Sequence, residues 1–302
     1  MSNTTPAFQT FRAIDWSGAK GSRLGGLQMS QCHPGDDCPQ LIRPATQRYW
    51  TRASLWQDLV AQAHVAGPVL AAFDMGLGLP FVDRNTYFPG WQEAPMTARQ
   101  LWRTIDRHAD CAPDFYGGLA CQPPSPLAPY FNAPGHRGPL FDINRCRRTE
   151  EVCRRWTRPS SVFNGVGAGS VGIGSLAGMR LLHTVRAART VRVRVWPFDR
   201  DMADADIVIV EMFPRLYALL AGANPQSWRE AEFLPHVLRH YHVRDPIHAQ
   251  ATTEDEVDAL FSAAAIRQLA ADPQTWSPTG MTDRAARYEG WIFGCTAAGD
   301  RG

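Results

Sequence analysis

Five acidic residues stand where regular structure is expected to begin or end, and carboxylates are side chains that bind metal ions. Three of them, Asp15, Asp74 and Glu211, close the apolar segments AID, AAFD and VIVE, which are typical of buried strands. Strands that alternate with helices tend to run parallel, so their carboxyl ends meet at one edge of a sheet. We therefore expect these acids to converge. Asp15 and Asp74 each precede a short turn, and a turn-capping role is the alternative.

The other two acids, Asp255 and Asp258, lie near the start of a helix predicted over residues 253–271. Thr253 and Glu256 fit a capping box, and acids in a first turn are stabilised by the helix dipole, which is sufficient to explain Asp255. Asp258 instead falls within the apolar arc of the helix, where an unpaired charge is costly. The pattern predicts that a cation holds Asp258 and that the helix start reaches the same sheet edge.

The chemistry of this acid set indicates which cation it would bind. Carboxylate oxygens suit hard cations, and the absence of histidine from the set favours Mg²⁺ or Mn²⁺ over zinc. The predicted metal ligands, which are also the predicted catalytic residues, are Asp15, Asp74, Glu211, Asp255 and Asp258. Two divalent ions held roughly 4 Å apart by carboxylates can hydrolyse a phosphodiester bond.

Arginines are concentrated in one part of the chain. Residues 145–194 contain eleven arginines and two acids, a net charge of +9, which leaves about −7 for the rest of the chain. Such asymmetry is expected of a phosphate-binding face, and a solvated arginine surface is the alternative. The residues predicted to contact phosphate are Arg154, Arg155, Arg158, Arg192 and Arg194, with Trp156 available for base stacking.

A glycine-rich run, SSVFNGVGAGSVGIGS over residues 160–175, leads into a helix predicted over 174–188. Backbone N–H groups at a helix start bind anions readily, so Ser170 and Ser175 are predicted to contact a substrate phosphate. The alternative is that the glycines let this segment pack closely against its neighbours.

The elements are expected to form one α/β domain over residues 1–302, with a mixed sheet flanked by helices. Residues 84–170 are predicted to form an inserted subdomain or lid, because a structureless loop of that length is uncommon in a compact domain. Strands are predicted over 8–18, 22–31, 40–50, 68–74 and 190–198 and up to Glu211. Helices are predicted over 52–66, near 97–109, over 214–221 and 228–241, and the segment RYEGWIFGC is a last strand or packed segment.

The composition is that of a globular protein, with 44% apolar and 20% charged residues. No apolar run approaches the length of a membrane span and the start of the chain lacks a signal-peptide pattern, so we expect a cytoplasmic protein without a membrane partner. The seven cysteines form no CxxC pair, which favours reduced thiols. A zinc site built from His108, Cys111, Cys121, Cys146 and Cys153 is an alternative whose spacing matches no standard site.

Several segments together resemble a bacterial family of predicted nucleases with the RNase H fold, grouped as a domain of unknown function. They are AIDWSG, FDMGLGLPF, VGIGSLAGMRLL, VWPF, VIVEMFPRLY, DEVDALFSAAAIR and EGWIFG. The order of elements is similar to that of Holliday-junction resolvases. The resemblance implies an RNase H-like sheet, Asp15 and Asp74 as the acids of the first and fourth strands, and Asp255 with Asp258 as the final pair. The large insertion expected after the fourth strand is a departure from this pattern. The resolvases typically have Glu where Asp74 stands, and Glu211 has no clear counterpart among their ligands.

The expected function is metal-dependent hydrolysis of nucleic acid, with the type of nucleic acid left open. An ATPase of the actin-like branch is an alternative, because an aspartate followed by glycine after the first strand, as in Asp15 to Gly18, also faces phosphate and metal there. A non-catalytic nucleic-acid-binding protein with the same fold is another. A homodimer would suit a junction resolvase, although no segment is predicted to be a dimer helix.

Overall fold

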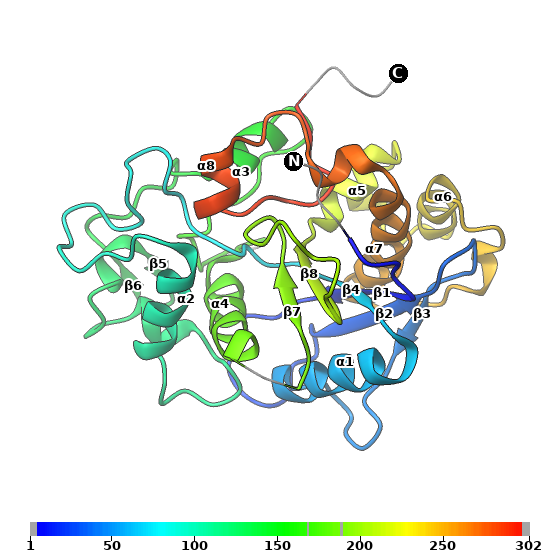
Figure 1. The fold of residues 1–302 in the computed structure, drawn as a ribbon, viewed down its shortest axis with the longest axis horizontal. Helices are drawn as coiled ribbons and strands as arrows, with labels where there is room; N and C mark the ends of the chain where they lie inside the picture. Colours follow the sequence, from blue (N-terminus) through cyan, green and yellow to red (C-terminus); the bar gives the residue numbers. More distant parts are fainter. Residues whose placement is uncertain (1–4, 168, 188–189, 298–302) are drawn as a thin grey trace.

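A computed structural model of the chain describes residues 5–167, 169–187 and 190–297. Its centre is a mixed sheet of six strands in the order β3-β2-β1-β4-β8-β7 (Figure 1). The strands are β1 (Thr10–Asp15), β2 (Gln28–Cys32), β3 (Gln40–Ile42), β4 (Val69–Phe73), β7 (Val193–Val195) and β8 (Ile207–Glu211). Strand β2 is antiparallel to β1 and β3, whereas β1, β4, β8 and β7 run parallel. The predicted α/β class and mixed sheet are confirmed.

Helices cover both faces of the sheet and make it the middle of three layers. One face packs against α1 (Arg52–Ala66) and α4 (Gly172–Ala187), and the other against α5 (Pro214–Leu220), α6 (Phe233–His240) and α7 (Glu254–Ala271). Side chains alternate along a strand, so Ile14 and Phe73 contribute to the first core, and Ala13 and Ala72 to the second. Strand β4 is buried on both faces, as its continuous apolar run predicts.

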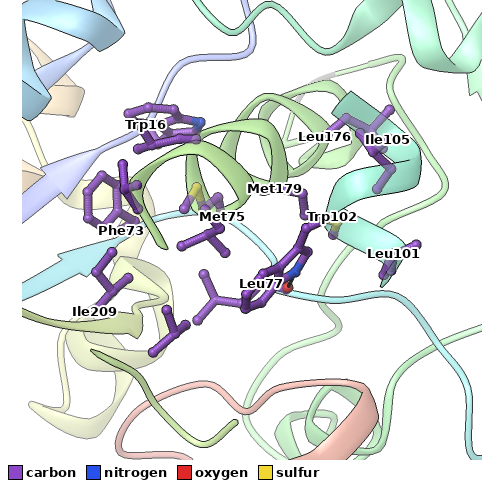
Figure 2. Close-up of a cluster of buried hydrophobic side chains, with 14 of the residues drawn as sticks. Trp16, Phe73, Met75, Leu77, Leu101, Trp102, Ile105, Leu176, Met179 and Ile209 are labelled. Atoms are coloured by element: carbon purple, nitrogen blue, oxygen red, sulfur yellow. Dashed lines mark hydrogen bonds between the residues drawn. The ribbon is translucent and has the colours of Figure 1, made fainter. Parts of the chain in front are cut away.

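The segment between Arg84 and Ser170 lies outside the sheet and covers α4. It contains α2 (Ala98–Arg107), α3 (Arg148–Cys153), the short 3-10 helices η1 (Gly118–Cys121) and η2 (Ala128–Tyr130), and a small second sheet of β5 (Asn132–Ala133) and β6 (His136–Arg137). Figure 2 shows Leu176 and Met179 of α4 between Phe73 and Ile209 of the sheet and the side chains of α2. The segment therefore shares one continuous core with the sheet.

The remaining short elements lie in the last third of the chain. They are η3 (Pro225–Ser227), η4 (Pro246–His248), η5 (Pro273–Trp276) and α8 (Asp283–Tyr288). The segment RYEGWIFGC is a packed segment rather than a full strand: Ile292 forms a single bridge with Glu211, and the N–H of Phe293 donates to the Glu211 carbonyl at 2.8 Å. Within the described ranges, none of the helices combines the length and apolar character needed to cross a bilayer.

Several predicted strands are shorter in the structure, for local reasons. Strand β2 begins only at Gln28 because a glycine-rich loop precedes it, and β3 ends at Ile42, shortly before Pro44, which has no N–H to donate. The strand predicted over 190–198 is limited to Val193–Val195.

Two helix boundaries also differ from the prediction. The helix predicted over 228–241 begins at Phe233, which places Pro235 in its first turn, where proline is tolerated. Helix α4 begins at Gly172, earlier than expected. The predicted last residue of that helix, Ala188, and Arg189 of the arginine-rich window lie outside the described residues.

Candidate functional site

Asp15 and Asp74 lie side by side at the carboxyl ends of adjacent parallel strands. Ile14 of β1 pairs with Phe73 of β4, and the N–H of Asp74 donates to the Ile14 carbonyl at 3.0 Å. Because Ala13 and Ala72 belong to the core under α7, the alternation of side chains turns Asp15 and Asp74 toward the same α7 side.

Helix α7 brings Asp255 and Asp258 to these two aspartates. Thr253 caps the helix and, with Glu256, forms the predicted capping box. The helix is held along β2, because the Ser30 hydroxyl donates to the Ala259 carbonyl at 2.6 Å. The start of α7 therefore lies at the carboxyl edge of β1 and β4, and each of the four aspartates keeps part of its surface open to solvent.

Burial and neighbouring acids raise the pKa values of all four aspartates. Burial, and then repulsion from Asp74, Asp258 and Asp255, hold the pKa of Asp15 well above its usual range. Burial and the charges of Glu211 and Asp255 raise the pKa of Asp74 to about 7. Burial raises the pKa of Asp258 well above its usual range and also raises that of Asp255, with neighbouring acids adding to both shifts. These residues therefore form one electrostatically coupled group.

Nothing in the described part of the chain compensates these charges. None of the described residues forms an ion pair with Asp15, Asp74, Asp255 or Asp258, and no side-chain hydrogen bond reaches their carboxylates there. Glu256, one residue from Asp255, shows the contrast, because its carboxylate accepts from Arg43 at 2.5 Å and from the Thr252 hydroxyl at 2.8 Å. A buried acid without a partner is expected to be protonated or to bind a cation.

The four carboxylates do not yet form a closed ligand set. Across the described ranges, no three His, Cys, Asp or Glu side chains converge closely enough to be identified as a metal site. The residue chemistry itself, all carboxylate oxygen, is that of a site for Mg²⁺ or Mn²⁺.

Glu211 stands at the same edge but faces the opposite side of the sheet. It follows Ile209 in the alternation of β8, and Ile209 belongs to the core under α4. The Arg147 guanidinium donates to both carboxylate oxygens of Glu211, at 2.6 and 2.7 Å. The N–H of Leu77 donates to one of these oxygens at 3.2 Å. Glu211 therefore has its own buried cation, and we leave it out of the proposed ligand set.

Most arginines of the 145–194 window form ion pairs within the protein. The pairs are Arg145 with Asp83, Arg147 with Glu150 and Glu211, Arg148 with Glu151, Arg180 with Asp106, Arg186 with Asp199, Arg192 with Asp206 and Arg194 with Asp204. The excess positive charge of this window is thus largely balanced by acids that the fold brings to it.

The predicted phosphate contacts fall in two places. Arg192 and Arg194 pair with acids that precede β8, at the amino ends of the strands, so the structure does not bring them to the aspartates. The other three are exposed after α3: Arg154 donates to Cys146 at 3.3 Å, Arg155 lies 3.6 Å from the Trp156 ring centre, and Arg158 donates to Asn144 at 3.0 Å. Arg158 leads into Pro159 and Ser160, which line a cavity of about 50 Å³ together with Asp74.

The glycine-rich run packs against the loops that follow the aspartates. Its residue Ala168 lies outside the described residues. The Trp16 ring N–H donates to the Gly174 carbonyl at 3.0 Å, and a Cβ on Gly18 would lie 2.6 Å from the Gly174 nitrogen. Ser175 is buried and accepts from the Gly76 N–H at 2.8 Å, whereas Ser170 is partly exposed. Close packing therefore accounts for Gly174 and Ser175.

Two buried arginines that the sequence did not single out for roles hold this region in place. Arg147 is one of them. The other, Arg52 at the start of α1, is fully buried and donates to the carbonyls of Ser17 at 2.6 Å and Ala19 at 2.8 Å, in the loop that follows Asp15. Nothing in the local sequence distinguishes Arg52 from an ordinary helix residue, because its partners are distant in the chain.

The cysteines do not gather around a zinc position. All seven are free thiols; Cys111 is exposed, and Cys121 donates to the Gly118 carbonyl at 3.2 Å. Cys153 lies beside Cys295, with their sulfur atoms 2.9 Å apart.

Comparison of the chain with protein-family models, with curated proteins and with solved structures gave no match, so its function has to be inferred from the site itself.

Proposed function

We propose that this protein is a metal-dependent nuclease with an RNase H-like fold. The fold proposal is supported by the strand order β3-β2-β1-β4-β8. Strand β2 is antiparallel to both of its neighbours, β1, β4 and β8 run parallel, and α1 lies between β3 and β4 in the chain. Strand β7 extends this sheet at one edge, and the segment 84–170 is the insertion that follows β4. The order agrees with the resemblance in the sequence motifs.

The observation that carries the functional proposal is the group of four uncompensated aspartates. Asp15 and Asp74 stand on rigid strand ends, and Asp255 and Asp258 approach from α7. These four residues would hold Mg²⁺ or Mn²⁺, which on binding would activate water and stabilise the departing oxygen of a phosphodiester. Their raised pKa values mean that metal binding displaces protons from the carboxyls.

The rest of the chain positions these carboxylates. Arg52 fixes the loop after Asp15, and Ser175 fixes the turn after Asp74 through the Gly76 N–H. Arg147 pairs with Glu211 behind the site, so the aspartates are left as the acids at this edge that have no cation among the described residues. The partly open surface of the four aspartates leaves room for a phosphate to approach.

Calorimetric titration with Mg²⁺ and Mn²⁺ tests the proposal directly. Wild type is expected to bind metal, and Asp15→Asn and Asp258→Asn are expected to lose at least about tenfold in affinity, which corresponds to ~1.4 kcal/mol. Glu230→Gln is the control, because Glu230 is an exposed acid outside this group and should leave binding nearly unchanged. Circular dichroism checks that each variant folds.

Cleavage assays then separate the alternatives. Metal-dependent cleavage of labelled DNA or RNA that is lost in Asp15→Asn supports the nuclease. Oligonucleotide binding without any metal binding would contradict it and favour a non-catalytic nucleic-acid-binding protein. Thermal stabilisation by ATP, without oligonucleotide binding, would favour the actin-like ATPase instead.

A further inference from the structure

A groove of about 590 Å³ opens beside the aspartates, and none of the described residues that line it is an acid. It is formed by Ser22, Arg23, Gly25, Gln47, Arg48 and Tyr49. One wall belongs to the loop between β1 and β2, which begins directly after Asp15. The other wall is the segment that leads into α1 at Arg52.

Two contacts place this groove next to the candidate metal ligands. Gly26, which follows the lining residue Gly25, lies against α7, because a Cβ built on it would be only 3.2 Å from a carboxylate oxygen of Asp255. Arg52, three residues after Tyr49, donates to the carbonyls of Ser17 and Ala19 and so ties the two walls together. A chain lying in the groove would therefore lead toward Asp255.

The groove carries positive charge that no carboxylate of the described residues neutralises. Arg23 and Arg48 are exposed, and over the described ranges neither of them forms an ion pair, unlike Arg192 and Arg194. Lys20, the only lysine of the chain, is exposed on the same loop.

The groove also offers an aromatic surface. Tyr49 is half-buried, and the Arg48 guanidinium carbon lies 5.3 Å from its ring centre. Guanidinium groups bind phosphate oxygens in a planar fork, and aromatic rings stack on unpaired bases.

We propose that this groove binds one strand of nucleic acid, with phosphates at Arg23 and Arg48 and a base against Tyr49. A single strand is favoured over a duplex because a base must be unpaired to expose its face to the ring. The volume of the groove is typical of clefts that bind small ligands, and it is enough for about one or two nucleotides. That the strand continues to the aspartates rests on the proposed nuclease function, whereas binding in the groove needs no metal.

Fluorescence anisotropy with a labelled, mixed-sequence oligonucleotide of about 12 nucleotides tests the groove in the presence of EDTA. The variant Arg23→Gln/Arg48→Gln is expected to bind about tenfold or more weakly. The plot of log affinity against log salt concentration has a negative slope, and the magnitude of this slope should decrease by about 1.4 in the variant, that is ~0.7 for each lost phosphate contact on a single strand. Tyr49→Leu should weaken binding roughly tenfold without changing this slope, because it removes stacking and no charge.

Arg229→Gln is the matched control. Arg229 is also exposed and lies over an aromatic ring, 4.2 Å from the ring centre of Trp228, but it lines a different hollow of the surface. The Arg229→Gln variant should bind the oligonucleotide with the same affinity as wild type.

Three results would overturn the groove proposal. The first is that Arg23→Gln/Arg48→Gln binds the oligonucleotide as tightly as wild type. The second is that Arg229→Gln loses as much affinity for the oligonucleotide as the groove variant does. The third is that a duplex of the same length binds as tightly as the single strand. The calorimetric metal titration distinguishes this failure from failure of the nuclease proposal. If the groove variants lose the oligonucleotide while wild type binds no metal, the groove stands and the nuclease does not. If wild type binds metal while the groove variants bind the oligonucleotide as tightly as wild type does, the nuclease proposal stands and the groove proposal fails.

Discussion

At the scale of single residues, carboxylates at one edge of the sheet lie in two opposite electrostatic environments. Glu211 is buried and shares both oxygens with Arg147, while Asp15, Asp74 and Asp258 repel one another. A paired buried carboxylate has its charge compensated within the fold, whereas a repelling group remains destabilising until a proton or a cation joins it. This difference separates a structural acid from a candidate ligand.

The pKa of Asp74 leads to a prediction about pH. Its folded-state pKa of about 7 lies above the ordinary aspartate value, so the folded protein holds this proton more tightly than the unfolded chain does. Without metal, the stability that the proton contributes is fully present below about pH 4 and is lost as pH rises through about 7. Metal affinity should increase over the same range, because the metal binds the carboxylate form.

Asp74→Asn provides the comparison for this prediction. The free energy of unfolding of the metal-free variant, measured by denaturation at several pH values, should improve relative to wild type as pH rises from about 5 to 7.5. Calorimetry of wild type in two buffers of different ionisation enthalpy should show proton release on metal binding near pH 6.5. A metal affinity that does not depend on pH would count against a raised pKa in the site.

At the scale of elements, buried arginines join segments that are far apart in the chain. Arg147, at the start of α3, contacts Glu211 at the end of β8 and Glu150 in its own helix. Burial by itself would lower the pKa of Arg147, but Glu211 and Glu150 raise it overall, so the guanidinium remains charged. The segment 84–170 is thereby attached to the carboxyl edge of the sheet.

Removing this guanidinium should be strongly destabilising. Arg147→Met would leave Glu211 and Glu150 buried without a cation, and a loss of about 3–5 kcal/mol in the free energy of unfolding is expected in urea denaturation. Arg148→Met is the neighbouring control, because Arg148 pairs with Glu151 at the exposed surface, where an ion pair contributes at most about 1 kcal/mol. Equal effects of the two changes would contradict the assigned role of Arg147.

The loop between β1 and β2 contains two adjacent glycines in different surroundings. A Cβ on Gly26 would lie 3.2 Å from a carboxylate oxygen of Asp255, while one on Gly25 would lie 3.9 Å from Tyr49, an ordinary contact. Gly26→Ala is therefore expected to displace Asp255 and weaken Mn²⁺ binding several-fold in calorimetry, and Gly25→Ala to leave it unchanged. A Gly26→Ala protein with wild-type metal affinity would contradict the prediction that the contact with Gly26 sets the position of the Asp255 carboxylate in the metal-bound protein.

At the scale of the whole molecule, charge is distributed so that the fold neutralises most of its arginines. The ion pairs of Arg145, Arg180 and Arg186 lie within or beside the segment 84–170, and few of the described cations of that window remain available to a ligand. The aspartates are the opposite case, a concentration of negative charge without a counterion among the described residues. Binding a divalent cation should therefore stabilise the entire fold.

Thermal denaturation measures this stabilisation. Mn²⁺ at 100 times its dissociation constant should add ~2.7 kcal/mol to the free energy of unfolding. For a chain of this size the midpoint should rise by roughly 4 °C. The double variant Asp15→Asn/Asp258→Asn should show no such rise, and an equal shift in that variant would mean that the metal acts elsewhere on the molecule.

Much of the element pattern follows from the sequence, because local periodicity and end signals are local properties. Helix α1 (Arg52–Ala66) begins and ends where its residues predict, and β1 and β8 end at Asp15 and Glu211 as expected. The extents of β2 and β3 were wrong, because a glycine-rich loop and Pro44 limit their pairing. Asp258 was identified as an acid that needs a partner from its helix face alone.

What the sequence by itself determined is thus the type of residue at each strand end and helix start. Only the tertiary structure decided which charges meet. The register of β1 with β4 placed Asp15 beside Asp74, the alternation of β8 turned Glu211 toward Arg147, and the packing of α1 made Arg52 a buried support of the first loop. The reason is physical, because an ion pair depends on distance in space, and residues far apart in the chain become neighbours only when the sheet and its helices assemble.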